Sequence, residues 1–230
     1  MKKMFPVSTG TLVLAATVAV LLSSSPVRAS LITINNPSFE TPALSCTAGP
    51  GCFSEDVFNS WIPSGAVATF RPSVGPGQEF TAIPDGLQVA AIANGSAGEI
   101  YQDLSATLSA NTTYTLTFWA GQRSDFPFDP GYTVSLMANG STTLASDTGA
   151  SPIAGSFVQR TLSFATGASP AQLGQTLRID IFAPAGSGQA DFDLFALNTN
   201  SNALPEPSSF GLLIIGLGLM AGARRLRTNS

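Results

Sequence analysis

A period-two alternation of apolar and polar residues is the feature that most limits how this chain can fold. In residues 113–120, Tyr114, Leu116 and Phe118 fall on one face of the segment, and threonines separate them. This alternation sends successive side chains to opposite faces of a β-strand. Further segments of this kind occur at residues 31–35, 87–93, 99–104, 132–137, 157–164, 177–182 and 190–197. One of them ends at Asn139-Gly140, which is typical of a hairpin turn.

The order of these segments predicts an all-β, antiparallel β-sandwich. Turn residues separate the segments at spacings of about 8–12 residues, and about nine strands are expected. Because polar residues alternate with apolar ones, each sheet should have one buried face and one wet face. We expect a single domain over residues 30–204, whose length of about 175 residues suffices for a full core.

The N-terminal segment predicts export. Lys2 and Lys3 precede an apolar stretch at residues 12–22, and small residues follow at 27–29. This order is typical of a signal peptide over residues 1–29, removed after Ala29 by signal peptidase once the Sec machinery has exported the chain. A membrane helix is the alternative, but the apolar stretch is short and residues 23–26 interrupt it.

The C-terminal segment, residues 205–230, joins three unlike parts in a fixed order. These are Pro205-Glu206-Pro207, an apolar run at residues 210–223, and the basic residues Arg224, Arg225 and Arg227. The prolines keep the tripeptide extended. As a transmembrane helix the run would span about 21 Å, less than the roughly 30 Å hydrocarbon core, so it predicts a short membrane anchor. The basic cluster should stay on the cytoplasmic side.

These three parts resemble the PEP-CTERM sorting signal of Gram-negative bacteria that make exopolysaccharide. The resemblance implies that exosortase recognises Pro205-Glu206-Pro207 and processes the protein nearby. It also implies a transient stay in the inner membrane, followed by release to the cell surface or extracellular matrix. The alternative is a plain C-terminal membrane anchor whose Pro-Glu-Pro is only a linker.

Charge excludes one class of partner. Between the two terminal signals, four arginines face thirteen carboxylates, with no lysine and no histidine, so the net charge is −9. A surface this acidic repels phosphate backbones, and we expect no nucleic-acid binding.

The only two cysteines, Cys46 and Cys52, enclose a Gly- and Pro-rich loop. In an oxidising compartment they predict a structural disulfide. Metal binding and a redox pair are the alternatives, but two thiols without histidine make a poor zinc site.

The composition also predicts a protein without catalytic activity. With no histidine in the chain, Ser-His and Cys-His arrangements are impossible. A carboxylate-based hydrolase needs only two acids. None of the thirteen stands out by its context, however, and Glu55, Asp56, Asp125 and Asp129 are interpreted as solvated turn acids.

Short motifs in three strands resemble those of the galactose-binding-like jelly roll, as found in carbohydrate-binding modules. They are residues 35–40, residues 101–102 with 110–116, and residues 191–194. The resemblance implies a jelly-roll topology and a structural Ca²⁺ held by Glu40 and Asp193, with Asp191 two residues earlier on the same strand face. Oxygen ligands suit Ca²⁺. The alternative is that these acids are exposed strand-end charges with no metal.

Aromatic residues suggest where a sugar would bind. Trp119 is out of phase with Tyr114, Leu116 and Phe118 and should lie on the opposite, wet face of its sheet. Phe126 and Phe128 lie in a loop of the kind that carries ligand sites. Trp61 is expected in the core.

The chain is therefore predicted to be an exported, non-catalytic surface or matrix protein that binds exopolysaccharide through its jelly roll. The alternative is a structural or adhesive biofilm protein that acts through protein–protein contacts.

Overall fold

The computed structural model describes residues 28–49, 51–55, 58–92, 95–127, 131–149 and 151–201. The predicted signal peptide, apart from its last two residues, and the predicted sorting segment lie outside these ranges. Within them, no helix is long and apolar enough to cross a membrane.

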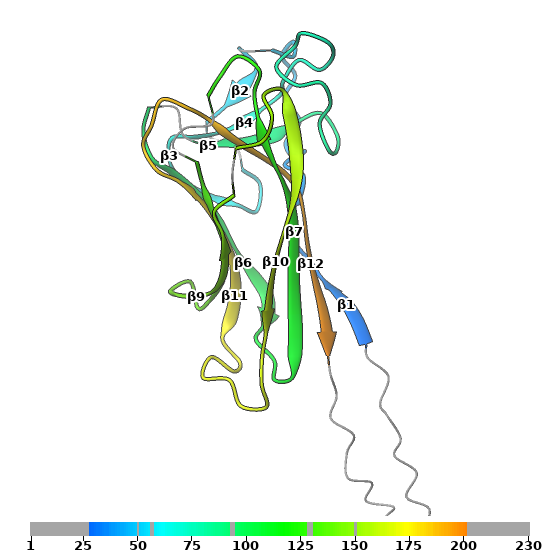
Figure 1. Ribbon diagram of the computed structural model, residues 1–230, viewed down its shortest axis with the longest axis vertical. Coiled ribbons are helices and arrows are strands. Elements are labelled where there is room, and N and C mark those ends of the chain that lie inside the picture. The colour runs from blue at the N-terminus through cyan, green and yellow to red at the C-terminus, as the bar shows by residue number, and fades with distance from the viewer. Residues whose placement is uncertain are drawn as a thin grey trace, which may run out of the picture. The chain divides into compact units, whose positions relative to one another are not determined.

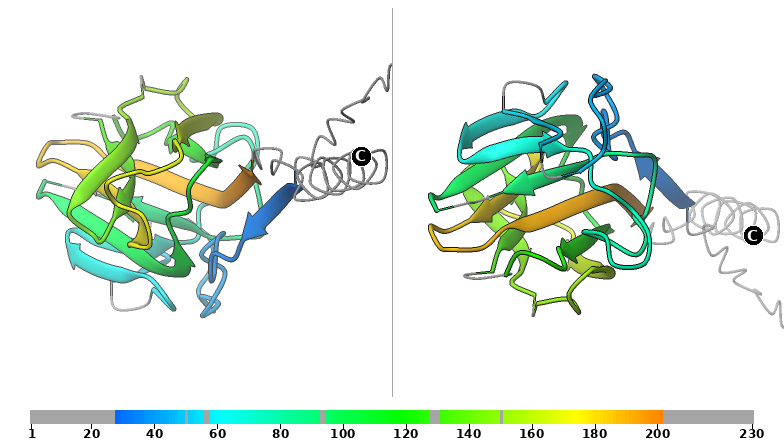
Figure 2. Two further views of the ribbon diagram at one scale, coloured as in Figure 1. Left: turned by 90° about the horizontal axis from the view of Figure 1, so that it is seen from below. Right: turned by 90° about the horizontal axis from the view of Figure 1, so that it is seen from above.

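In the part of the chain that the structure describes, twelve strands form two antiparallel sheets that face each other, so the predicted all-β sandwich architecture is confirmed (Figure 1). The seven-stranded sheet has the order β10 (Ser156–Ala165), β7 (Thr112–Gln122), β12 (Ala190–Ser201), β5 (Val89–Ile92), β4 (Val67–Phe70) and β2 (Phe53–Ser54), and β1 (Arg28–Ile32) pairs with β12. The five-stranded sheet has the order β3 (Ile62–Gly65), β6 (Gly98–Thr107), β11 (Thr176–Ala183), β8 (Thr133–Ala138) and β9 (Thr142–Asp147). Figure 2 shows β12 (orange) beside β1 (blue), the last strand next to the first.

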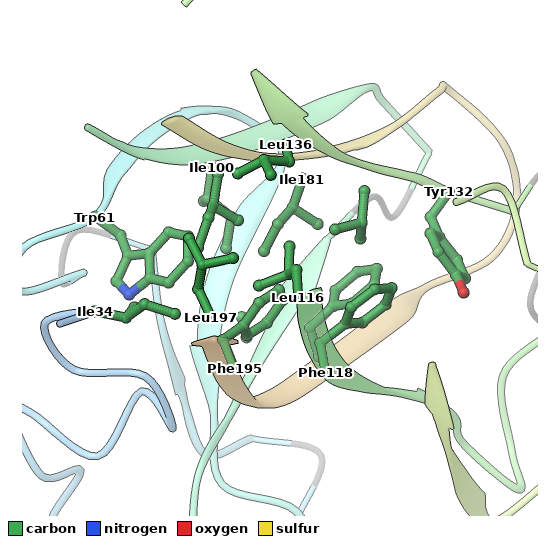
Figure 3. Close-up of a cluster of buried hydrophobic side chains, with 14 of the residues drawn as sticks. Ile34, Trp61, Ile100, Leu116, Phe118, Tyr132, Leu136, Ile181, Phe195 and Leu197 are labelled. Atoms are coloured by element: carbon green, nitrogen blue, oxygen red, sulfur yellow. The ribbon is translucent and has the colours of Figure 1, made fainter. Parts of the chain in front are cut away.

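The core lies between the sheets and follows the alternation of the sequence. Tyr114, Leu116 and Phe118 of β7 are all buried, as their common phase predicts. Phe118 stacks on Phe195 with 5.3 Å between ring centroids. Figure 3 shows side chains of both sheets meeting in this cluster. Trp61 is also in the core, as predicted, and its Nε1 donates a hydrogen bond to the Asn36 carbonyl at 3.0 Å.

The predicted turn at Asn139-Gly140 is confirmed. Both residues have positive φ values, 51° and 62°, and they connect the antiparallel strands β8 and β9. Two consecutive positive φ values are what a type I′ hairpin requires.

The structure also joins Cys46 and Cys52 in a disulfide, with 5.5 Å between their Cα atoms. This confirms the predicted structural disulfide.

A long connection covers part of the outer face of the seven-stranded sheet. It runs from Arg71 to Gln88 between β4 and β5, and we refer to it as the 71–88 segment. The backbone N–H of Thr81 donates to the Gly155 carbonyl at 2.9 Å, and the 71–88 segment accepts a bond from Ser124 at the Glu79 carbonyl. These bonds join the segment to the ends of β7 and β10.

Candidate functional site

The strand register places an acidic residue in the middle of a row of small side chains. The cross-strand pairs are Ala68 with Ala91, Ala91 with Asp191, Asp191 with Gly121, and Gly121 with Phe157. Directly paired residues share one face of a sheet, and this row faces away from the core. The small residues leave room around the carboxyl group of Asp191.

Asp191 is fully buried. Its Oδ1 accepts a hydrogen bond from Gln189 Nε2 at 2.7 Å, whereas its Oδ2 is buried without a hydrogen-bond partner. Burial raises the pKa of Asp191 from 3.8 to about 7, against the smaller lowering effects of Gln189 and Arg123. When neutral, this carboxyl group can carry its proton on Oδ2, the oxygen that makes no hydrogen bond within the protein.

An arginine organises the polar side of the site. Arg123 donates two hydrogen bonds to Asp125, at 3.0 and 2.8 Å, and lies 3.5 Å from Glu79 Oε1. Its Nη1 donates to Gln189 Oε1 at 3.4 Å. The guanidinium carbon is 4.8 Å from the ring centroid of Phe70. Arg123 is therefore held from several sides, and Gln189 connects it to Asp191.

Aromatic side chains cover the row of small residues. A Cβ added to Gly121 would lie 2.4 Å from the Phe157 ring, so this ring lies directly on β7 beside Asp191. Phe80, from the 71–88 segment, is fully buried and its centroid is 4.6 Å from that of Phe157. Together these rings shield the carboxyl group from water.

Beside this row lies a cavity of about 570 Å³. Its apolar wall includes Phe53, Ala68, Phe70 and Ala91, and its polar wall includes Glu55, Arg123 and Gln189. Gln189 hydrogen-bonds Asp191 and Ala91 pairs with it across the sheet. A ligand in the cavity would therefore contact the immediate neighbours of the buried acid. The size and mixed lining are typical of a small-molecule site.

The three aromatic residues predicted to bind sugar do not lie in one place in the structure. Trp119 is half-buried on the outer face, paired with Gln159 and Asp193, which confirms its predicted orientation. Phe126 lies 5.4 Å from the Arg123 guanidinium, next to the polar wall of the cavity. Phe128 lies outside the described residues. A binding role for these three rings stays a prediction.

The predicted calcium ligands divide into two places. Glu40 Oε1 accepts bonds from the N–H groups of Leu87 and Gln88, and Asp193 Oδ2 accepts one from Asp85, so both carboxylates lie on one turn. Burial raises the pKa of Asp193 to about 8, against the smaller lowering effects of the backbone hydrogen bonds from Asp85 and Leu194. Asp191 instead binds Gln189. In the part of the chain that the structure describes, no three His, Cys, Asp or Glu side chains gather into a metal-binding group.

Sequence reasoning missed most of the cavity's polar groups. Arg123 and Gln189 were not singled out, and Glu55, interpreted as a solvated turn acid, lines the cavity. Asp191 was named only as a calcium ligand. The one available signal was its place in a strand directly between the apolar residues Ala190 and Phe192.

Comparison with known proteins decides the class of the protein. Residues 30–198 match the HpiC1-like family, described as HpiC1 cyclase. The chain belongs to the HpiC1-like cyclase family. Among curated proteins, none matches the chain.

Solved structures agree with this membership. A Stig cyclase, Fisc from Fischerella sp. TAU, in complex with (3Z)-3-(1-methyl-2-pyrrolidinylidene)-3H-indole, is 27% identical with a TM-score of 0.64, covering 75% of this chain and 98% of that one. A cyclase from the same source in complex with 4-(1H-indol-3-yl)butan-2-one is 27% identical with a TM-score of 0.61, covering 74% and 97%. Carbohydrate-binding modules are also among the matches, but TmCBM61 with β-1,4-galactotriose reaches only 18% identity and a TM-score of 0.43. So distant a likeness supports no argument about sugar binding.

Family membership overturns the predicted function. The prediction of a non-catalytic surface or matrix protein, whether it binds exopolysaccharide or adheres to proteins, is wrong, because the chain belongs to a family of enzymes. The physical error lay in the treatment of histidine. A buried aspartate whose pKa is raised to about 7 can supply acid chemistry near neutral pH without any histidine.

Proposed function

We propose that this protein is a cyclase that closes a ring within one substrate molecule by donating a proton from Asp191. The observation that supports this proposal best is the buried carboxyl group of Asp191, whose Oδ2 has no hydrogen-bond partner in the protein and whose neighbours Ala91 and Gln189 line the cavity. Buried polar atoms are rarely left unpaired in proteins, so an unpaired one whose neighbours line a cavity supports a role in ligand chemistry. Membership of a cyclase family supports the reaction class.

The proposed reaction is an isomerisation that consumes no co-reactant. The neutral Asp191 carboxyl group gives its proton to a basic atom of the substrate. The cation that results is attacked by a π bond of the same molecule, and this forms the new carbon–carbon bond. A ring proton then leaves and returns to the Asp191 carboxylate. Phe53 and Phe70 in the cavity wall can stabilise the intermediate positive charge through their ring faces.

We further propose a mainly apolar substrate that carries an indole ring. The two similar Fischerella cyclases hold indole compounds. The cavity of this chain offers an apolar wall from β2, β4 and β5, which suits a flat ring system.

Asp191→Asn tests the acid directly. Indole-bearing unsaturated compounds are incubated with the full chain, and products of unchanged mass are sought by chromatography and NMR. We expect the variant to lose about a hundredfold or more in kcat, because an amide cannot donate an acidic proton. It should still bind 4-(1H-indol-3-yl)butan-2-one in calorimetry. Asp103→Asn, on the other sheet, is the matched control. Wild-type turnover by Asp191→Asn would rule out the proposal.

A second variant tests the cavity. Ala68 lies on β4 with its side chain in the cavity wall, half-buried and outside the core. Ala68→Phe should fill the space and abolish binding of the same ketone, while the melting temperature stays close to that of the wild type. Ala165→Phe, at an exposed position of β10, should bind normally. Unchanged binding by Ala68→Phe would place the ligand elsewhere.

We propose that the two terminal segments are targeting signals for export and sorting. We also propose that the sandwich between them has the jelly-roll topology. The support is the order of parts in residues 1–29 and 205–230. Signal peptidase and exosortase would then leave a mature cyclase at the cell surface, starting near Ser30 and ending near Pro205. Intact-mass measurement on protein from its native host tests this, and a mature species that retains residues 210–227 would contradict sorting.

We also propose a structural Ca²⁺ at Glu40 and Asp193. Both carboxylates point at the turn of residues 85–88, and all their donor atoms are oxygens, which suits Ca²⁺. Chelation should then lower the melting temperature, because a ligand bound only by the folded state stabilises it. Identical melting curves with and without chelator would mean that Glu40 and Asp193 bind no Ca²⁺ and only accept hydrogen bonds from the turn.

A further inference from the structure

We infer that Arg123 determines which substrates the cavity accepts, because its Nη1 donates a hydrogen bond to an uncharged acceptor atom of the ligand, such as a ketone oxygen. This assignment rests on the proposed binding of the substrate in the cavity and does not depend on which group supplies the proton. The substrate class that follows is an indole compound that carries a carbonyl or similar neutral acceptor.

The guanidinium group of Arg123 lies where the polar and apolar walls of the cavity adjoin. Arg123 directly follows β7, and Gln189 directly precedes β12, the antiparallel neighbour of β7. Both residues line the cavity, whose apolar wall comes from β2, β4 and β5. Because β12 also pairs with β5, the two walls are continuous. A ring that lies against the apolar wall is therefore next to the guanidinium group.

One hydrogen-bond donor of Arg123 is left over within the protein. A guanidinium group has five N–H donors and no acceptor. Nε and Nη2 donate to Asp125 at 3.0 and 2.8 Å, and Nη2 also lies 3.5 Å from Glu79 Oε1. Nη1 donates to Gln189 Oε1 at 3.4 Å, and its second N–H has no acceptor among the described residues. Since only 7% of Arg123 is exposed, an acceptor supplied by a ligand would relieve the cost of this unpaired donor.

The spare N–H lies on the side of the guanidinium group that remains open. Asp125 and Glu79 occupy the edges of Nε and Nη2. The rings of Phe70 and Phe126 lie against the group, with centroids 4.8 and 5.4 Å from its central carbon. A bidentate arginine packed on aromatic rings has little freedom to reorient. Nη1 is therefore the atom through which Arg123 meets a ligand in the cavity.

The charges around Arg123 favour a neutral acceptor over an anion. Asp125 and Glu79 already place two carboxylates on this one cation, and Glu55 adds a third carboxylate to the lining of the cavity. An anionic ligand would meet three negative charges and one positive charge. A ketone oxygen would instead gain a charge-assisted hydrogen bond without this repulsion.

The competing explanation is that Arg123 only joins connections of the fold. Backbone bonds already link the same connections, because Ser124 N–H donates to the Glu79 carbonyl at 2.9 Å and Gln189 N–H donates to the Pro127 carbonyl at 3.0 Å. A purely structural arginine would affect the binding of all ligands alike. The two roles are therefore separated by ligands that differ only in the acceptor group.

The first measurement compares three compounds of one shape by calorimetry on the full wild-type chain. They are 4-(1H-indol-3-yl)butan-2-one, 3-butylindole, which has CH₂ in place of the carbonyl group, and 3-(1H-indol-3-yl)propanoate, which has a carboxylate in place of the acetyl group. We expect the propanoate to bind about tenfold or more weakly than the ketone, because it brings a like charge to the carboxylates of the site.

The second measurement removes the guanidinium group without leaving a buried carboxylate unbalanced. A chain with both Arg123→Met and Glu79→Gln is compared with Glu79→Gln alone, because Glu79 is only 5% exposed and would otherwise lose its cation. Between these two proteins the affinity of the ketone relative to 3-butylindole should fall about tenfold or more, the usual effect of losing a hydrogen bond to a charged donor.

Two further variants calibrate this ratio of affinities. Arg123→Lys keeps the charge but not the planar fork, so the ratio should fall by a smaller factor, and this variant provides the comparison if the double variant does not fold. Arg178→Met removes an arginine–carboxylate pair from the other sheet and should leave the ratio at its wild-type value. Melting curves show that each protein is folded.

A variant of Gln189 tests whether a different donor holds the ketone. Gln189 Nε2 donates to Asp191 Oδ1 at 2.7 Å and carries a second N–H. Gln189→Met should keep the ratio, because both N–H groups of Arg123 Nη1 are then available to the ligand. If Gln189→Met loses the ratio and the Arg123 variants keep it, the amide selects the ligand and the assignment to Arg123 is wrong.

The inference and the proposed function fail in different ways. If the wild type does not bind the ketone, or if Ala68→Phe binds it equally well, the ligand site is wrong and the role of Arg123 is wrong with it. If Ala68→Phe prevents binding but the ratio is the same with and without the guanidinium group, or the propanoate binds the wild type as tightly as the ketone, only the role of Arg123 is wrong. Turnover by Asp191→Asn concerns the proton donor alone.

Discussion

The carboxyl groups of this protein differ in pKa because they contact different neighbours, which are remote in sequence. Asp191 is an acid with a raised pKa because β5, β7 and the 71–88 segment bury it. Asp103, by contrast, has its pKa lowered by a hydrogen bond from Arg178, 75 residues away. In the sequence both are acids in alternating strands. The site could not be predicted for this reason: burial and partner are set by the strand register, which the alternation alone does not specify.

Asp180 gives a prediction about pH. Burial, and then a hydrogen bond with the Glu99 side chain, raise its pKa from 3.8 to about 7. The folded state therefore keeps a proton that the unfolded chain releases, so the contribution of Asp180 to stability is fully present below pH 4 and is lost as the pH rises toward 7. Asp180→Asn should remove this loss, so its melting temperature should exceed that of the wild type at pH 8 but match it more closely at pH 4.5.

Asp103→Asn is the control on the same sheet face. Its pKa is lowered, so its stabilising contribution is present at neutral pH and is lost on acidification. The variant should be no more stable than wild type at pH 8. Thermal unfolding of the three proteins in buffers from pH 4 to 8 measures these differences. A difference in melting temperature between wild type and Asp180→Asn that stays constant across this range would contradict the assignment for Asp180.

At the scale of elements, the sequence predicted the long central strands well and the short outer ones poorly. The segment at residues 113–120 becomes β7 (Thr112–Gln122), and that at 177–182 becomes β11 (Thr176–Ala183). Their alternation is long and their buried face is continuous. The strand β3 (Ile62–Gly65) was missed because proline and glycine argue against a strand interior, yet both are tolerated at the sheet edge where β3 lies. The 71–88 segment has no alternation of apolar and polar residues, so its packing over the outer face of the seven-stranded sheet was not predictable.

Phe80 anchors the 71–88 segment on the outer face of the seven-stranded sheet. Its ring is fully buried against Phe157. Phe80→Ala should cost about 3–5 kcal/mol, the usual range for loss of a buried ring. Since Phe80 packs in a small cluster with Phe70, Val89 and Ala91, separate from the main core, we expect the 71–88 segment to open before the sheets do. Hydrogen exchange should accelerate at the amides of Thr81, Asp85 and Ser124, which bond the segment to its surroundings.

Phe164→Ala, on β10 against the main core, provides the comparison. It should lower overall stability without selective exchange at Thr81, Asp85 and Ser124. If hydrogen exchange in Phe80→Ala accelerated equally in all strands, the 71–88 segment would not open independently of the sheets.

At the scale of the whole molecule, the two sheets are joined by a polar cluster as well as by the apolar core. Asp147 at the end of β9 belongs to the five-stranded sheet, and Arg160 on β10 belongs to the seven-stranded sheet. Arg160 binds Asp147 through two contacts, at 3.1 and 2.6 Å, and the Tyr132 hydroxyl donates to the same carboxylate at 2.8 Å. Burial, and then Asp147, raise the pKa of Tyr132, which keeps its hydroxyl protonated as the donor. The strand β10, which contributes Arg160 to this cluster, also carries Phe157 of the candidate site.

Comparison of two arginine pairs tests whether the contact between sheets matters more than one within a sheet. The Arg160–Asp147 side chains are 31% and 14% exposed, whereas those of Arg178–Asp103, which lie within the five-stranded sheet, are 20% and 48% exposed. Arg160→Met leaves a mostly buried carboxylate without its cation, so we expect a loss of about 1.5–3 kcal/mol in the free energy of unfolding. Arg178→Met frees a carboxylate that water can solvate, and the expected loss is about 0–1 kcal/mol. Urea unfolding with equal m values for all three proteins would measure both losses. Equal losses would mean that the cluster between the sheets adds nothing beyond an ordinary surface ion pair.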